Sequence, residues 1–105
     1  MAGRIAMVKH IVMWNLRGET PAQKHAAVAL LKSRFEALVG IVPGLRLLEI
    51  GADTSAVDYA CDVVLYAEFD SQAALDAYAG HPAHTRVRQE IGDLRTARHQ
   101  VDYSA

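Results

Sequence analysis

Three side chains that can hold or transfer protons lie between Tyr78 and His84, on both sides of a proline. Pro82 has no backbone N–H and disfavours helical dihedral angles at His81, so a helix that reaches Tyr78 should end near Gly80. Proline suits the first position of a new helix, which makes His81 the N-cap and His84 the third helical residue. In one continuous helix Tyr78 and His84 would point about 240° apart. The predicted break lets a phenol and an imidazole converge on one cavity.

A histidine and a tyrosine in one cavity suit acid–base chemistry beside a carbonyl group. His84 is the candidate base that removes the proton, and Tyr78 is the candidate donor to the developing oxyanion. The positive end of the helix dipole disfavours the imidazolium near the third helical position, which keeps His84 available as a base. The same pair would serve ring closure, isomerisation or decarboxylation.

Each of these residues also has a purely structural interpretation. His81 can act only as the N-cap that satisfies amides at the helix start, although we keep it as a candidate binding residue. Tyr78 can be a core residue whose hydroxyl bonds to the loop, and His10 a hydrogen-bonded core histidine. The histidines show no H-x-H or H-x₃-H spacing on a regular element, so we expect no metal.

The hydrophobic pattern predicts the elements that position these residues. Strands are expected at 7–16, 45–51, 60–69 and 94–103, and helices at 21–41, about 71–79 and 82–92. The first helix begins with a capping box formed by Thr20 and Gln23, with Pro21 at its first position. The order is therefore βαββαβ with the last helix broken in two, an α+β, ferredoxin-like fold.

The first predicted strand is apolar on both faces. Val12, Trp14 and Leu16 share one face, and Met7, Ile11 and Met13 share the other. Two helices cover only one face of a four-stranded sheet, so the second face would be a large exposed apolar patch in a monomer. We therefore expect a homodimer that packs through this second face.

Length and composition indicate a single globular domain over residues 1–105. The chain is 51% hydrophobic with a net charge of −1, which provides no electrostatic footprint for nucleic acid or an anionic membrane. A single cysteine, Cys61, excludes an intramolecular disulfide. No apolar run approaches the roughly 20 residues of a membrane span, and no signal-peptide core is found, so we expect a cytoplasmic protein.

The segment Tyr78–His84 resembles the Tyr-x-x-His-Pro-x-His signature of the stress-responsive A/B barrel family, which consists of small dimeric α+β barrel proteins. The resemblance also covers the strand Val8–Val12, the turn Val42–Leu45 and the closing Asp102-Tyr103. It implies a dimeric α+β barrel with a pocket between the sheet and the helices. One member of the family is a cyclase that closes a polyketide ring by aldol condensation, whereas most bacterial members have no assigned activity.

The resemblance also implies which residues form the pocket. His84 matches the catalytic histidine of the cyclase and Tyr78 its partner tyrosine. Residues that would line the pocket and bind substrate are His10, Val12, Trp14, Leu31, Phe35 and Leu65. On the last strand, Arg98 and Gln100 stand where the cyclase has apolar walls, which favours a carboxylate or another polar ligand. A register shifted by one residue would instead turn Ala97, Val101 and Tyr103 inward.

Three functions remain open at this point. The first is a cofactor-free cyclase, lyase or isomerase that acts on a small oxygenated metabolite. The second is a non-catalytic, stress-responsive dimeric binding protein whose tyrosine and histidines order the broken helix. The third, by analogy with sister dimeric barrels, is a haem-degrading or quinol-oxidising monooxygenase. Our principal interpretation requires no cofactor.

Overall fold

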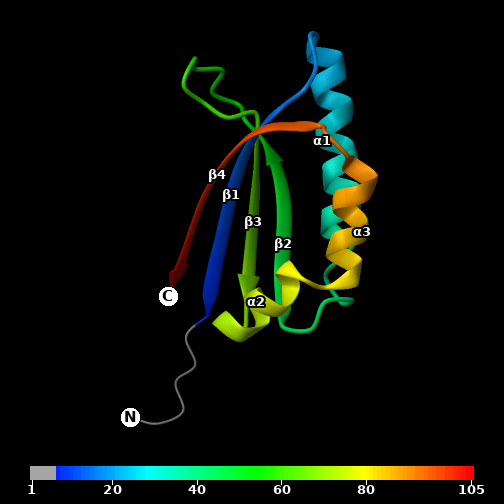
Figure 1. The fold of residues 1–105 in the computed structure, drawn as a ribbon. Helices are drawn as coiled ribbons and strands as arrows, with labels where there is room; N and C mark the ends of the chain where they lie inside the picture. Colours follow the sequence, from blue (N-terminus) through cyan, green and yellow to red (C-terminus); the bar gives the residue numbers. More distant parts are fainter. Residues whose placement is uncertain (1–6) are drawn as a thin grey trace.

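The computed structural model describes residues 7–105, which fold into four strands and three helices. They follow in the order β1 (Val8–Leu16), α1 (Pro21–Glu36), β2 (Leu45–Ala52), β3 (Val63–Phe69), α2 (Gln72–Ala79), α3 (Pro82–Ile91) and β4 (Arg95–Ser104). The strands form one antiparallel sheet in the order β2-β3-β1-β4. The helices lie to one side of this sheet (Figure 1). The predicted ferredoxin-like βαββαβ order, with its broken last helix, is confirmed.

The core lies between the helices and the face of the sheet that they cover. Along β1, buried residues alternate with more exposed ones, as expected for a strand whose two faces have different surroundings. The inner face of β3 is entirely apolar and consists of the buried residues Val63, Leu65, Ala67 and Phe69. Leu31 and Phe35 of α1 have no exposed surface and belong to the same core.

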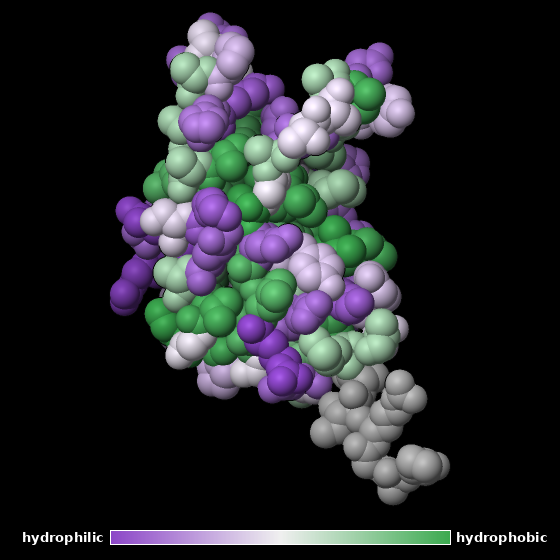
Figure 2. Space-filling view, turned by 180° about the vertical axis from the view of Figure 1, so that it is seen from behind, coloured by the Kyte–Doolittle hydropathy of each residue, from purple (hydrophilic) through white to green (hydrophobic). Residues whose placement is uncertain are grey.

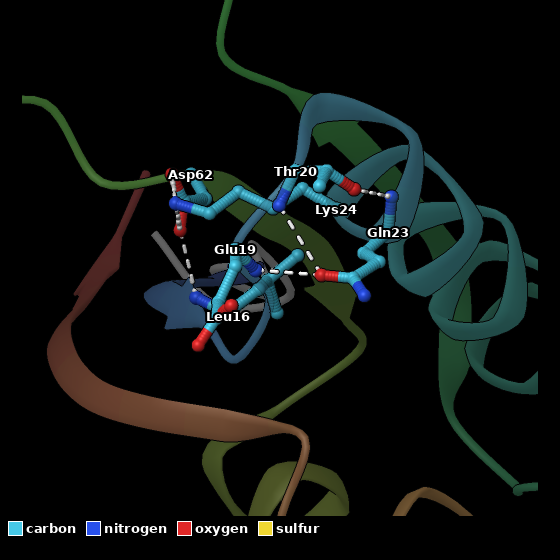
Figure 3. A network of polar contacts seen from close by, with 6 residues as sticks. All are labelled: Leu16, Glu19, Thr20, Gln23, Lys24 and Asp62. Atoms are coloured by element: carbon cyan, nitrogen blue, oxygen red, sulfur yellow. Dashed lines mark hydrogen bonds and ion pairs between the residues drawn. The ribbon is translucent and has the colours of Figure 1, made fainter.

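A polar network fixes the start of α1 against the end of β1 (Figure 3). Thr20 and Gln23 form the predicted capping box: the Gln23 amide donates to Thr20 Oγ1 over 3.1 Å, and the Thr20 amide donates to Gln23 Oε1 over 3.2 Å. Asp62 accepts from the Leu16 amide at 2.8 Å and from Lys24 Nζ at 3.2 Å. The helix, β1 and the segment before β3 are thereby joined at one end of the sheet.

Two predicted element boundaries are wrong. Helix α1 ends at Glu36 instead of residue 41, because the following amides of Leu38 and Ile41 bond to carbonyls only three residues back. Strand β3 begins at Val63 instead of residue 60, because the Asp62 amide and carbonyl bond to Trp14 and Asp53 outside the regular ladder.

Gly44 occupies the turn between α1 and β2 for two physical reasons. Its φ of +81° lies in the left-handed region that disfavours a side chain. A Cβ at this position would also lie 2.5 Å from the Cβ of Ala74 on α2. The glycine therefore permits the turn to pack closely against the helix that carries Tyr78.

The break between α2 and α3 has the predicted form. Helix α2 is capped by Ser71, whose side chain accepts from the Ala74 amide, and it ends at Ala79. His81 is the N-cap of α3 and Pro82 its first residue; His81 Nδ1 accepts from the Ala83 amide at 3.0 Å. The two short helices therefore meet at Gly80 and His81, directly beside the two candidate catalytic residues.

The other face of the sheet retains partly exposed apolar side chains. Met13, Val101 and Tyr103 expose 38%, 52% and 44% of their surfaces. Ile11 lies opposite Val101 on the neighbouring strand and is half-buried. Seen from behind, the molecule shows apolar surface interspersed with polar side chains (Figure 2).

The pairing of β1 with β4 determines which side chains of β4 face the helices. Arg98 lies opposite Trp14, Gln100 opposite Val12, and Asp102 opposite His10. Directly opposed residues point to the same face of a sheet. The three polar side chains therefore share the face of the buried β1 residues, and the alternative register that would turn Ala97, Val101 and Tyr103 inward is wrong.

Candidate functional site

A cavity of about 190 Å³ lies between the helix-covered face of the sheet and the broken helix. The residues that line it come from all three helices and from β1, β3 and β4: His10, Val12, Trp14, Phe35, Leu65, Gln72, Leu75, Asp76, Tyr78, Ala79, His84, Arg95, Arg98, Gln100 and Asp102. Strand β4 is one of the two edge strands of the sheet, and its side chains remain exposed along most of its length. The cavity therefore has a deep apolar part over β1 and β3 and a polar side along β4.

The backbone contact of His84 determines which ring nitrogen carries the proton, and its surroundings favour the neutral ring. Its Nδ1 lies 3.2 Å from the Ala79 carbonyl oxygen, which can only accept, so Nδ1 carries the proton and Nε2 keeps its lone pair. Burial lowers the pKa of His84, and the nearby Arg88, Arg95 and Arg98 lower it further, against the opposing effect of the Ala79 carbonyl.

Tyr78 lies against His84 at the wall of the cavity. The two ring centroids are 4.2 Å apart, with an angle of 31° between the ring planes. Burial raises the pKa of Tyr78 far above its ordinary value, so the phenol stays protonated at neutral pH. A phenol that keeps its proton can donate a hydrogen bond to a negatively charged oxygen.

His10 is the only buried polar residue among residues 7–105, and it is paired with a carboxylate. Its Nδ1 lies 2.6 Å from Asp102 Oδ1; the carboxylate accepts, so Nδ1 carries a proton. The Gln100 side chain donates to the other oxygen of Asp102 at 3.0 Å, and Arg98 donates to Gln100. A chain of hydrogen bonds thus runs along β4 from a guanidinium to a buried imidazole.

An aromatic stack forms part of the cavity lining. Trp14 lies 5.5 Å from Phe35 between ring centroids, with an angle of 29° between the planes. The guanidinium carbon of Arg95 lies 4.8 Å from the Trp14 ring centroid. The wall is apolar over the core and ends in a cation at the β4 side.

Most of the residues chosen from the sequence meet at this cavity. Eight of them line it: His10, Val12, Trp14, Phe35, Leu65, Tyr78, His84 and Arg98. Leu31 does not, because it is fully buried in the core beneath α1. His81 does not either, since its ring nitrogen caps α3.

The sequence analysis missed several polar residues of the cavity. Asp102 lies four residues from Arg98 and two from Gln100, which the sequence analysis had already named, so the same period-two spacing along β4 could have placed it on their face. Arg95 lies three residues from Arg98, so the period-two spacing does not place it on the same face. Gln72 and Asp76 of α2 bond to each other over 3.0 Å at the cavity rim, and helical spacing alone does not reveal that they face it.

Neither a metal centre nor a membrane-spanning helix is found in the part of the chain that the structure describes. Residues 7–105 contain no cluster of three or more histidine, cysteine, aspartate or glutamate side chains arranged to hold a metal ion. No helix within the same residues is long and apolar enough to cross a membrane.

The fold and the cavity between its sheet and its broken helix define a class of small α+β barrel domains. Residues 8–105 match the family model of the stress-responsive A/B barrel domain, and the chain belongs to this family. A comparison with curated proteins finds no match.

Solved structures similar to this chain include dimeric proteins and an enzyme. A dimeric protein of unknown function with a ferredoxin-like fold from Bacteroides fragilis is 31% identical, with a TM-score of 0.82 over 94% of this chain and 96% of that chain. A Dabb family protein with a ferredoxin-like fold from Mesorhizobium loti is 22% identical, with a TM-score of 0.72 over 93% and 95% of the two chains. The hydroxynitrile lyase of Passiflora edulis is 14% identical, with a TM-score of 0.76 over 97% and 95%.

Proposed function

We propose that this protein binds a small oxygenated metabolite in its cavity and catalyses proton transfer next to a carbonyl group without a cofactor, as a cyclase, lyase or isomerase. The observation that carries the proposal is the geometry of His84. Its Nδ1 is occupied by the Ala79 carbonyl, its Nε2 is unprotonated, and the protonated phenol of Tyr78 lies beside it. A base and a hydrogen-bond donor adjoining one cavity are the minimal groups for enolisation.

The reaction balances within the substrate and these two residues. His84 Nε2 takes the proton from the carbon next to the carbonyl, and the C–H electron pair becomes the enolate double bond. The carbonyl π pair moves to oxygen, where the Tyr78 hydroxyl donates a hydrogen bond. In ring closure the enolate carbon attacks a second carbonyl of the substrate, the π pair of that carbonyl moves to its oxygen, and the resulting alkoxide takes the proton back from His84. In isomerisation of an unsaturated ketone the enolate is conjugated with the C=C bond, and it recovers the proton from His84 at the far carbon of that bond, so that the double bond moves.

The remaining cavity residues have binding roles in this proposal. Val12, Leu65 and the Trp14–Phe35 stack exclude water from the apolar part of the substrate. His10, held by Asp102, presents its other ring nitrogen as a second polar contact. The hydroxynitrile lyase on the same fold is similar at 14% identity only, so the proposal rests on this chain's own residues.

We also propose that the protein is a homodimer that packs through the uncovered face of the sheet. The partly exposed Met13, Val101 and Tyr103 on this face support it, as do the dimeric structural neighbours. A single cysteine fits a reducing compartment, and we place the protein in the cytoplasm.

Proton–deuterium exchange in ketones tests the catalytic proposal. The protein is incubated in D₂O with levulinate or methyl propyl ketone, and loss of the protons next to the carbonyl is followed by NMR. Wild type should accelerate exchange of at least one ketone, and His84→Gln should reduce the acceleration by about a hundredfold or more. Tyr78→Phe should reduce it with its circular dichroism spectrum unchanged. The matched control is His25→Gln, which changes an exposed histidine on α1.

The other two functions give different results in the same experiments. No exchange above background with either ketone, or equal exchange in wild type and His84→Gln, would contradict catalysis and favour the non-catalytic, stress-responsive binding protein. A visible absorption band after addition of haem would favour the monooxygenase instead. Measurements of stability also distinguish the three functions. If Tyr78 or His81 is purely structural, its substitution should strongly destabilise the fold.

A further inference from the structure

Two arginines project into the cavity from the same short stretch of β4. Arg95 and Arg98 are three residues apart, and in a regular strand such residues point to opposite faces. The pairing with β1 is irregular here: Arg98 lies opposite Trp14 and Ala97 opposite Asn15, but Arg95 lies opposite Leu16. Thr96 is therefore an extra residue without a partner, a β-bulge that turns both guanidinium groups toward the same site.

Neither guanidinium is neutralised by a carboxylate among residues 7–105. Ion pairs in this part of the chain hold Arg17, Arg34 and Arg46, but not the two cavity arginines. Arg95 is half-buried and packs against the face of Trp14. Its side-chain N–H donors have no hydrogen-bond partner among residues 7–105. Arg98 donates to the neutral amide of Gln100. Two fixed cations with free donors are a suitable site for an anion.

The charges are ordered along the cavity. Arg95 and Arg98 lie beside Trp14. Asp102 lies opposite His10, four residues along β4 from Arg98. Asp102 is engaged by His10 and Gln100, and Asp76 at the rim by Gln72. Burial and the neighbouring Arg98 and Arg88 lower the pKa of Arg95, consistent with cations gathered at one end without a counter-charge. One end of the cavity is therefore cationic and the other is hydrogen-bonding.

We propose that Arg95 and Arg98 form a carboxylate-binding subsite, so that the substrate of this protein is a small keto acid whose carboxylate binds at the Trp14 end. This inference deepens the proposed function and rests on the same cavity. Guanidinium groups bind carboxylates through paired, charge-assisted hydrogen bonds. With the carboxylate held there, the carbonyl group lies toward Tyr78 and His84. The bulge at Thr96 turns both arginines toward the cavity, and the cavity therefore favours acidic substrates over neutral ones.

A matched pair of ligands tests the subsite directly. Levulinate and methyl propyl ketone share a methyl ketone and similar length, but only levulinate carries a carboxylate. Binding is measured by NMR titration of the cavity residues in His84→Gln, which binds without turning the ligand over. We expect levulinate to bind at least tenfold more tightly than the neutral ketone. Arg98→Gln should abolish this preference, and Arg95→Lys, which keeps the charge but loses the planar fork, should reduce it.

Controls and outcomes separate this inference from the catalytic proposal. Arg86→Gln removes an exposed arginine of α3 that does not line the cavity, and it should keep the preference. Equal affinity for the two ligands, no binding of either, or a preference that survives both cavity substitutions would overturn the carboxylate subsite. Exchange of the neutral ketone that depends on His84, without a preference for levulinate, would leave catalysis standing and refute the subsite. A preference for levulinate without exchange of either ketone would support the subsite and contradict catalysis.

Discussion

The two faces of the sheet are built from the same strands but have opposite surroundings. On β1, Val12 and Trp14 expose 1% and 2% of their surfaces beneath the helices, whereas Met13 between them exposes 38% on the other side. Both faces are apolar at these positions, so composition does not distinguish them. The two faces differ in what packs against them. The helices cover one face and leave a cavity at the β4 edge, whereas no element of the described residues covers the other face. The difference supports our proposals that the covered face binds a ligand and that the open face joins two copies.

The largest expected effect is on the covered face. Phe35→Ala should lower the free energy of unfolding by about 3–5 kcal/mol, because a fully buried aromatic side chain is lost and a cavity remains. Urea unfolding followed by circular dichroism measures it. The matched control is Tyr59→Ala, which removes an aromatic side chain that is 87% exposed and should change stability by about 0.5 kcal/mol or less. Similar losses for the two variants would contradict the contrast in burial.

A single charge on the open face of the sheet should disrupt the proposed dimer. Val101→Asp places an unpaired carboxylate on the surface proposed to join two copies, and should weaken the dimer by more than tenfold. Light scattering across a dilution series measures the mass. Val39→Asp changes a valine that is 40% exposed in the turn after α1, away from the sheet, and should leave the dimer intact. A protein that is already a monomer, or a dimer unaffected by Val101→Asp, would show that this face does not mediate assembly.

A smaller effect is the dependence of exchange activity and stability on pH, which we expect from His84 on the covered face. Burial and Arg88, Arg95 and Arg98 lower the pKa of His84 below its ordinary value, and the neutral ring of Tyr78 stacks on it. Exchange activity should therefore stay on a plateau at neutral pH and fall only below the ordinary histidine range. The unfolded chain binds this proton more readily, so stability should also fall as pH decreases from about 6.5 through the lowered value.

Unfolding and exchange measured between neutral and acid pH in wild type and His84→Gln provide the check. The variant should lose part of the acid destabilisation, whereas His25→Gln, on exposed α1 surface, should retain it. An activity profile that falls at or above the ordinary histidine pKa would contradict a neutral, buried base.

The smallest effect concerns the capping box that anchors α1 over the covered face. Thr20→Ala removes the acceptor for the Gln23 amide and should cost about 1 kcal/mol of stability. Thermal or urea unfolding measures it, with the loop residue Thr54→Ala as a neutral control. The dimer and the levulinate preference should be unchanged, because none of the residues in the network of Figure 3 lines the cavity. A loss of ligand preference in Thr20→Ala would show that the two regions are coupled.

The sequence by itself determined the order of elements and the break in the last helix. Pro82 has one fixed φ and no amide proton, so the end of α2 and the start of α3 follow from local chemistry wherever the chain folds. The alternation of β1 and the capping box at Thr20 are equally local, and they placed Val12, Trp14 and the start of α1 correctly. Eight of the ten residues chosen for the site, mainly on the resemblance to the family, line the cavity.

Only the tertiary structure decided the polar side of the cavity. The partner of His10 is Asp102, 92 residues away, and a contact across strands that are distant in sequence has no local signature. The bulge at Thr96 brings Arg95 to the same side as Arg98, against the period of a regular strand, because it arises from how β4 pairs with β1. One side of β4 carries Arg98, Gln100 and Asp102 and the other carries Ala97, Val101 and Tyr103, but the pattern of the strand alone does not say which side faces the helices. The pairing of the edge strand with β1 removed that ambiguity, since hydrogen bonding between strands fixes which side chains share a face.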